Sequence, residues 1–127
     1  MYLLDTHTLL WFLNDDPKLS KKVKELIETT QQIYVSIGTF WEMSIKNSIG
    51  KLSLPAPISE IIAGCESLGF SVLPIKAAHL ERLKTLPFIH RDPFDRLLIC
   101  QAQAEDMTLI TVDESIVKYD VRTKWDS

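Results

Sequence analysis

Residues 90–113 read HRDPFDRLLICQAQAEDMTLITVD, and this stretch predicts a capped helix followed by a short buried strand. Asp92 is suited to cap the helix. Pro93 is suited to its first position, because proline lacks the N–H group that a first turn leaves unpaired. Residues 108–112 are apolar and β-branched, which predicts a strand that ends at Asp113.

The same alternation of strands and helices extends over the rest of the chain. The predicted strands are residues 2–5, 32–37, 70–75, 108–112 and an edge strand at 121–125. The predicted helices are residues 8–13, 20–29, 39–47, 58–68, 77–86, 93–106 and a short one at 115–119. This order predicts an α/β fold, a three-layer α/β/α sandwich around a mostly parallel sheet, in one domain over residues 1–127.

Four acidic residues lie at the ends of short apolar segments: Asp5 in YLLDT, Glu42 in TFWEMS, Asp95 in DPFDRLLI and Asp113 in LITVD. Two close β-type runs, and two lie in the first turn of predicted helices. In an open α/β sheet, strand ends and helix starts share the edge where ligands bind. Clustered carboxylates repel each other unless cations hold them, and such oxygen ligands suit Mg²⁺ or Mn²⁺. The pattern therefore predicts metal-dependent phosphodiester chemistry.

Each acid also has a purely structural explanation. Glu42 stands three residues after Thr39, which is the spacing of a capping box. Asp95 in a first turn is favoured by the helix dipole. Asp5 and Asp113 suit turns after strands. For Asp5 the metal-ligand interpretation is favoured, because an unpaired carboxylate directly after two leucines lies close to the core, where it is costly.

Three segments of the chain resemble a PIN domain: MYLLDTHTLLW, WEMSIK and the long segment HRDPFDRLLICQAQAEDMTLITVD. They occur in order, at the expected spacing, over nearly the whole chain, and the nearest resemblance is to the VapC-type toxins of toxin–antitoxin systems. The resemblance implies a PIN-like sandwich and an endoribonuclease that uses one or two Mg²⁺ or Mn²⁺ ions. The implied ligand and catalytic residues are Asp5, Glu42, Asp95 and Asp113.

The charges then predict the reaction, in which a metal-activated water attacks the phosphate and the ions stabilise developing charge. Thr6 and Thr111 are candidates to orient carboxylates or water; the alternative is a strand-end hydroxyl bonded to backbone. Asp92 is predicted as a helix cap, with a supporting role at the site as the alternative. Arg96 is a candidate to contact RNA phosphate or to neutralise the acids. A lone His90 is more often structural or exposed.

Composition limits the partners. The 127 residues carry a net charge of −3, so bulk charge does not hold this chain on RNA and any contact needs a local basic patch. No apolar run reaches membrane-spanning length, and a bacterial or archaeal cytoplasm is expected. Cys65 and Cys100 lie in apolar helical stretches and are expected to be buried free thiols.

The resemblance also implies a small antitoxin partner and a homodimer. Four large aromatic residues near two helix starts are candidates for such a contact surface, with ordinary core packing as the alternative. They are Trp11, Phe12, Phe40 and Trp41.

A different class of function is a non-enzymatic regulatory or binding domain with an acidic metal or phosphate site, such as a receiver-like switch. Receivers normally show an adjacent acidic pair after the first strand and a lysine after the last, and this chain has neither in that place. A PIN-like binding module with a decayed site is a third possibility. The presence of all four acids counts against it.

Overall fold

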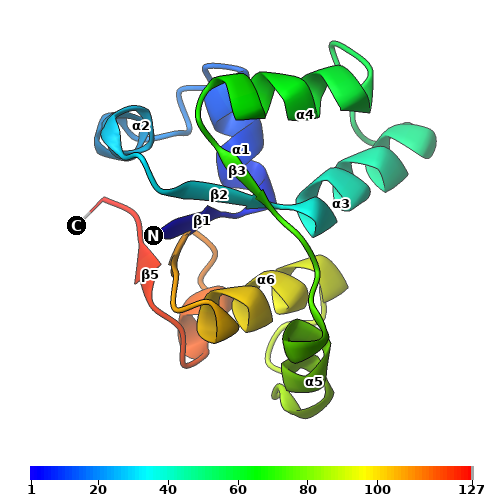
Figure 1. Ribbon diagram of the computed structural model, residues 1–127, viewed down its shortest axis with the longest axis vertical. Coiled ribbons are helices and arrows are strands. Elements are labelled where there is room, and N and C mark those ends of the chain that lie inside the picture. Colours follow the sequence, from blue (N-terminus) through cyan, green and yellow to red (C-terminus); the bar gives the residue numbers. More distant parts are fainter. Residues whose placement is uncertain (127) are drawn as a thin grey trace.

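The computed structural model, which describes residues 1–126, has a central sheet of five strands in the order β3-β2-β1-β4-β5 (Figure 1). The strands are β1 Tyr2–Leu4, β2 Ile33–Ser36, β3 Ser71–Leu73, β4 Thr108–Ile110 and β5 Thr123–Lys124. All four pairings in this sheet are parallel. The predicted α/β fold is therefore confirmed, as is the predicted edge strand near the C-terminal end.

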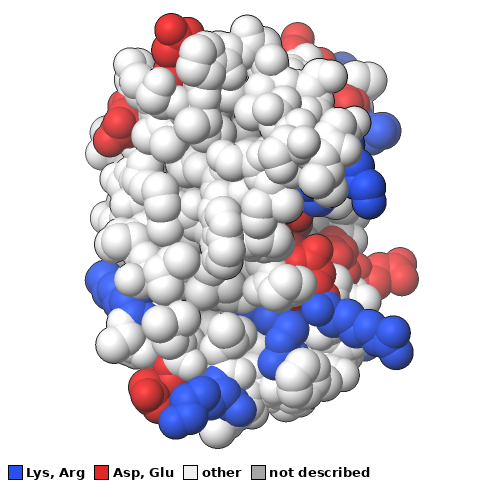
Figure 2. Space-filling model, turned by 90° about the vertical axis from the view of Figure 1, so that its right-hand side faces the viewer, with Lys and Arg blue, Asp and Glu red and all other residues white. Residues whose placement is uncertain are grey.

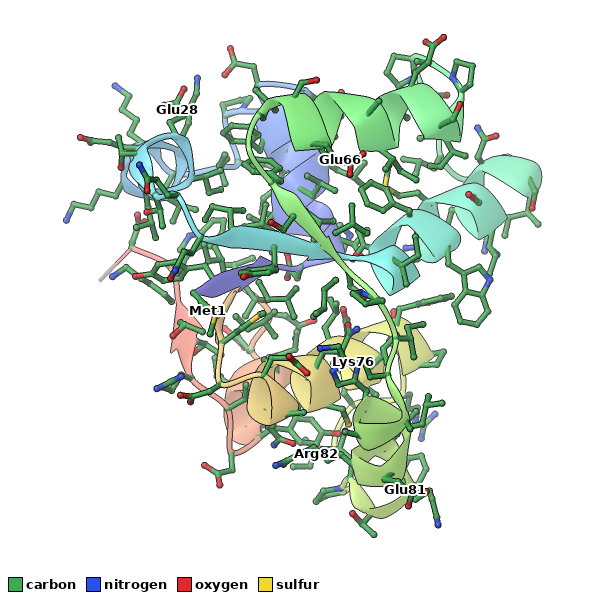
Figure 3. All side chains as sticks on the ribbon, viewed as in Figure 1. Met1, Glu28, Glu66, Lys76, Glu81 and Arg82 are labelled. Atoms are coloured by element: carbon green, nitrogen blue, oxygen red, sulfur yellow. The ribbon has the colours of Figure 1, made fainter. Side chains whose placement is uncertain are left out.

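Helices cover both faces of the sheet, which makes three layers (Figure 1). The helices are α1 Thr6–Leu13, α2 Lys21–Thr29, α3 Ile37–Ser48, α4 Ile58–Ser67, α5 Ala77–Thr85, α6 Pro93–Ala104 and the 3-10 turn η1 Ile116–Lys118. Side chains of α1 to α4 form one apolar core with the sheet, and those of α6 and η1 form a second core on the other face. Figure 3 shows side chains filling the space between the sheet and the helices on both faces, with Glu28 and Glu81 on the outer surfaces of α2 and α5.

The central strand β1 is buried on both faces. Leu4 belongs to the core with α1 and α3, and Leu3 belongs to the core with α6, because successive side chains of a strand point to opposite faces. Neither leucine is exposed to solvent. A strand of this kind reads as a continuous apolar run, which is why YLL was predictable as a strand.

The chain order places the strand ends at one edge of the sheet. From β1 the chain moves outward through β2 to β3, and it then returns to the other side of β1 to form β4 and β5. The reversal lies between β1 and β4, and ligands of open parallel sheets bind at such a reversal. Asp5 follows β1 directly, and Thr111 follows β4 directly.

Several predicted element ends are confirmed. The Asp92 side chain accepts hydrogen bonds at the start of α6, and Pro93 is the first residue of that helix. Gly69 stands just after α4 with φ +91°, a backbone conformation that residues with a side chain rarely adopt.

Cys65 and Cys100 are buried free thiols.

The predicted start of α3 is wrong. The helix begins at Ile37, and Ser36 is its N-cap, with Ser36 Oγ accepting from Gly38 N–H at 3.0 Å. Thr39 Oγ1 is buried and has no hydrogen-bond partner among the described residues, so the predicted capping box is absent. Glu42 consequently lies beyond the first turn. The cause is that β2 passes into α3 without a loop, so the serine that ends the strand also caps the helix.

Helices α3 and α6 approach each other closely at Gly38. A Cβ atom on this residue would lie 2.6 Å from Leu97 Cδ2, which is closer than such atoms come. The glycine therefore allows α3 to lie against α6, the helix that carries Asp95. Helix α3 itself carries Glu42, so this contact brings two of the four acids toward each other.

A search of the described residues for a membrane span found no helix of sufficient length and apolarity.

The unpaired Thr39 hydroxyl gives a test of the α3 start. A buried hydroxyl without a partner costs free energy, so Thr39→Val should raise the free energy of unfolding by about 1 kcal/mol. Ser36→Ala removes the observed cap and should lower it by about 1 kcal/mol. Urea unfolding of both variants measures these changes. A destabilised Thr39→Val protein would show that this hydroxyl is paired after all.

Candidate functional site

Asp5 is a buried carboxylate held by two neighbouring groups. It follows β1 and caps α1, with Oδ1 accepting from Thr8 N–H at 2.8 Å. Its Oδ2 accepts from the Thr111 hydroxyl at 2.6 Å. Burial raises the pKa of Asp5, and these hydrogen bonds only partly offset the rise. Asp5 therefore acts as a helix cap, but it also remains a buried acid without an ion-pair partner among the described residues.

Thr111 links two of the predicted ligands. Its hydroxyl donates to Asp5 Oδ2 and also accepts from Asp113 N–H at 3.0 Å. One hydroxyl thus fixes the carboxylate after β1 and the backbone after β4. Predicted roles for this threonine were to orient a carboxylate or to bond to backbone, and it does both.

Glu42 is buried on α3, and both of its carboxylate oxygens have partners. Oε1 accepts from the Thr6 hydroxyl at 2.6 Å, and Oε2 lies 2.8 Å from Lys46 Nζ. The hydrogen bond to Glu42 raises the pKa of Lys46, and the charges of Asp92 and Asp95 add to the rise. Lys46 therefore interacts with Asp92 and Asp95 as well as with Glu42, its neighbour on the helix.

Asp95 is a partly buried carboxylate with a strongly raised pKa. Its side chain is 18% exposed, and its pKa is raised to about 7. Burial is the largest cause, followed by the negative charges of Asp92, Asp5 and Glu42, while the charge of His90 opposes the rise. The charges of the acids that follow β1, lie on α3 and precede α6 thus act on the Asp95 carboxylate. These acids therefore gather at one edge of the sheet.

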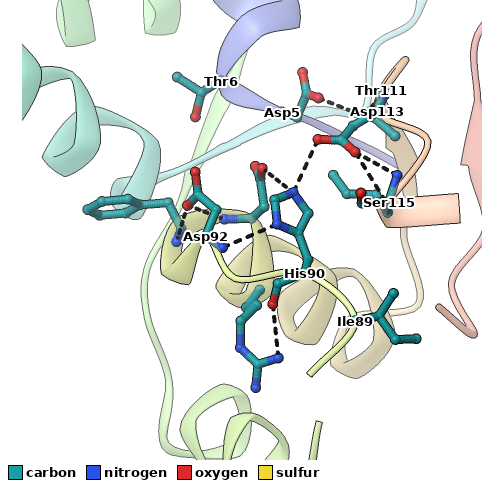
Figure 4. Close-up of polar contacts among 12 residues, drawn as sticks. Asp5, Thr6, Ile89, His90, Asp92, Thr111, Asp113 and Ser115 are labelled. Atoms are coloured by element: carbon teal, nitrogen blue, oxygen red, sulfur yellow. Dashed lines mark hydrogen bonds and ion pairs between the residues drawn. The ribbon is translucent and has the colours of Figure 1, made fainter. Parts of the chain in front are cut away.

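His90 joins Asp95 to Asp113. Its Nε2 lies 3.0 Å from Asp95 Oδ2 and 3.2 Å from Asp113 Oδ2 (Figure 4). Its Nδ1 accepts from Asp92 N–H at 3.2 Å, which assigns the hydrogen of the neutral ring to Nε2. His90, Asp95 and Asp113 each offer one potential metal-ligand atom, and these atoms lie within 4.8 Å of one another.

Asp113 differs from Asp95 in its protonation. Burial would raise the pKa of Asp113, but the Ser115 N–H group, His90 and the Ile116 N–H group outweigh it and hold the pKa below its usual value. Its Oδ1 accepts from Ser115 N–H at 2.7 Å. The site therefore combines a carboxylate that stays ionised with one that readily takes a proton.

Arg96 faces away from the acidic group. Its guanidinium donates to the carbonyl oxygens of Pro87 at 2.8 Å and Leu86 at 3.1 Å, and it is buried. The guanidinium N–H groups that were predicted to contact RNA phosphate therefore donate to carbonyl oxygens of the loop before α6. Asp92 accepts from Phe94 N–H at 2.8 Å and from Asp95 N–H at 3.2 Å, which are the contacts of a cap.

The structure thus brings Asp95, Asp113 and His90 into direct contact. Asp5 is connected to Asp113 through Thr111, and Glu42 acts on Asp95 by its charge. The sequence analysis did not place His90 at the site. The only available signal was its position three residues before a helix whose first turn carries an acid. Figure 2 looks at the side toward which α3 extends, where acidic side chains gather with basic side chains above and below them.

This arrangement fits a divalent cation. Asp5 and Asp95 both have raised pKa values, because burial disfavours their charged forms, and at Asp95 the charges of neighbouring acids add to the rise. Asp5, Glu42, Asp95 and Asp113 carry carboxylate oxygens, and oxygens of this kind are the ligands that Mg²⁺ and Mn²⁺ prefer. A bound cation would favour the ionised forms of these buried carboxylates.

Comparisons with known proteins identify the family and the fold. The model of the PIN domain family matches residues 2–122. The VapBC2 complex of Rickettsia felis contains a similar chain, with 17% identity, 98% of each chain covered and a TM-score of 0.73. VapBC of Salmonella typhimurium gives 16% identity, coverage of 97% of this chain and 96% of the other, and a TM-score of 0.71.

FitAcB of Neisseria gonorrhoeae gives 18% identity, coverage of 97% and 96%, and a TM-score of 0.66. At these identities the structures show a shared fold. A comparison with curated protein sequences found no match.

The raised pKa of Asp95 predicts how stability depends on pH. Between its ordinary value of 3.8 and about 7, folded metal-free protein keeps a proton on Asp95 that the unfolded chain has lost. This group therefore makes stability fall as pH rises through that window. Asp95→Asn should remove the fall and stabilise the protein at pH 8, by at most on the order of 4 kcal/mol.

Urea unfolding in EDTA at pH 5 and pH 8 measures this effect, with Asp120→Asn as the matched control for an exposed acid. If the stability difference between wild type and Asp95→Asn is the same at both pH values, the assignment of this pKa is wrong.

Proposed function

The chain belongs to the PIN domain family, and we propose that it is a metal-dependent endoribonuclease, the toxin of a toxin–antitoxin pair. PIN domains are generally nucleases, and the structural relatives are chains of toxin–antitoxin complexes. The observation that carries the proposal is the gathering of buried acids around Asp95, where burial and the charges of neighbouring carboxylates together raise the pKa to about 7. Such an accumulation of buried negative charge is costly unless a cation binds there.

The residues proposed to hold one or two Mg²⁺ or Mn²⁺ ions are Asp5, Glu42, Asp95 and Asp113. A bound ion of this kind lowers the pKa of water and stabilises negative charge on phosphate oxygens. The chain's own contribution is to fix the carboxylates in advance. Hydroxyl groups of Thr111 and Thr6 each hold one carboxylate oxygen at 2.6 Å, and such supporting contacts orient metal ligands.

His90 and Lys46 limit the cost of assembling these acids. The His90 ring hydrogen lies between Asp95 and Asp113, and the Lys46 ammonium neutralises Glu42. Lys46 is 38% exposed at its side chain, so it can also reach a phosphate group in solvent. With a net charge of −3 on the whole chain, local cations of this kind are needed to attract RNA.

The proposed partners are a small antitoxin and a second copy of the chain, acting in the cytoplasm. Four exposed apolar residues form a stripe at a spacing of four along α3 and its C-cap residue, and stripes of this kind mark contact surfaces. They are Ile37, Trp41, Ile45 and Ile49. Of the aromatic residues proposed for a contact surface, Trp41 is 57% exposed, whereas Phe40 is in the core. The stripe supports the homodimer, because a helix can pack on its own copy.

The proposed function predicts that the protein cleaves single-stranded RNA with Mg²⁺ or Mn²⁺ and that EDTA stops it. Asp5→Asn should lower the rate by at least about 100-fold, because it removes charge from the centre of the site. The same change should relieve the growth arrest that expression of wild type causes. Asp120→Asn, an identical chemical change at an exposed position outside the site, should leave both unchanged. Undiminished cleavage in EDTA would contradict the metal mechanism.

A further inference from the structure

Phe88 is the most exposed large apolar residue among the described residues, with 85% of its surface in solvent. It lies in the loop between α5 and α6, two residues before His90. An exposed phenylalanine is not unusual by itself. The backbone on both sides of Phe88, however, forms hydrogen bonds with two buried side chains.

The first is Tyr119, which is 6% exposed. Its hydroxyl accepts from the N–H groups of Ile89 at 2.9 Å and His90 at 2.7 Å, and it donates to the Pro87 carbonyl at 2.6 Å. One hydroxyl therefore holds the residue before Phe88 and the two residues after it.

The second is Arg96, which is 5% exposed and donates to the carbonyl groups of Leu86 and Pro87. The same guanidinium lies 3.9 Å from the centre of the Phe88 ring. A cation in this position attracts the electrons of a ring and holds it in place. Arg96 therefore covers one part of the ring, and the rest faces solvent.

Burying an arginine and a tyrosine is costly unless their polar groups are paired. Here both are paired with the loop that presents Phe88, so the fold holds an apolar ring rigidly in water. A ring that is already ordered loses little entropy when a flat ligand stacks on it. The location is also specific, because the neighbouring His90 contacts Asp95 and Asp113 in the proposed active site.

We propose that Phe88 is a stacking subsite for one base of a single-stranded RNA that extends from the acidic site along the loop before α6. The inference rests on the proposed function and names a residue that holds the substrate. Every base has a flat face, so such a subsite tolerates different sequences. Arg91, exposed in the same loop, and Lys84, exposed in the last turn of α5 and paired there with Glu81 at 3.3 Å, supply positive charge for the adjoining phosphates.

Protein contact is a weaker explanation for this ring. A stable interface buries about 800 Å² on each partner, with an apolar centre. The exposed apolar surface of this loop consists of three successive residues, Pro87, Phe88 and Ile89, which is far smaller than such an interface. The stripe on α3 fits a protein partner better.

The test uses Asp5→Asn protein, so that RNA is bound without being cleaved, and a short single-stranded RNA that contains 2-aminopurine. The fluorescence of this base falls when it stacks on an aromatic ring. In that background Phe88→Leu, which keeps apolar bulk but removes the ring, should weaken binding by about tenfold and abolish the fluorescence decrease. Phe88→Trp should retain both. Ile89→Ala, a loss of apolar surface at the next residue, is the matched control and should change neither.

Equal binding and equal fluorescence for Phe88→Leu and the Asp5→Asn parent would overturn the subsite and leave the proposed nuclease standing. A Phe88→Leu protein that changes oligomeric state while its RNA affinity stays the same would overturn it as well and assign the ring to protein contact. If protein with Asp5 intact cleaves no RNA but the Phe88-dependent binding is observed, the subsite stands and the nuclease proposal fails. Absence of any RNA binding overturns both.

Discussion

Burial of the Asp5 carboxylate at the end of the central strand is the constraint on which the site depends. The parallel sheet puts this residue between β2 and β4, directly after two leucines that are fully buried. Its two oxygens are held by Thr8 and Thr111, and Thr111 in turn holds the backbone of Asp113. The fold thus fixes this acid at the edge of the sheet where charged side chains of α3, of α6 and of the segment after β4 also lie.

The carboxylates of the site differ in how their negative charge is compensated. Glu42 is neutralised by Lys46, and Asp113 stays ionised because backbone N–H groups and His90 favour its charge. At Asp95, burial and the charges of neighbouring acids outweigh the opposing charge of His90, so its pKa rises to about 7. A bound divalent cation would change these protonation states, because it would supply positive charge that the described residues lack. The same shortage of positive charge explains why His90, between Asp95 and Asp113, is part of the site.

The sequence predicted the features that depend on local rules. The Asp92 cap, Pro93 and the strand–helix order follow from short-range chemistry, and the structure confirms them. Features that depend on distant contacts were missed. The α3 start was misplaced because Ser36 serves both strand and helix, and the direction of Arg96 depends on the carbonyl groups of another segment. Placing His90 required knowing that β4 brings Asp113 beside α6. The roles of the four acids as metal ligands remain a prediction.

The most direct test of the central claim is calorimetric titration of metal-free protein with Mn²⁺. If the acids hold the metal, wild type should bind Mn²⁺ saturably, binding should weaken by at least about tenfold in Asp95→Asn and in Glu42→Gln, and it should stay unchanged in Asp120→Asn. All four proteins need the same folded state in EDTA, which circular dichroism checks. Equal Mn²⁺ affinity in wild type, Asp95→Asn and Glu42→Gln would contradict the account, because the acids at the end of the sheet would then not hold the metal.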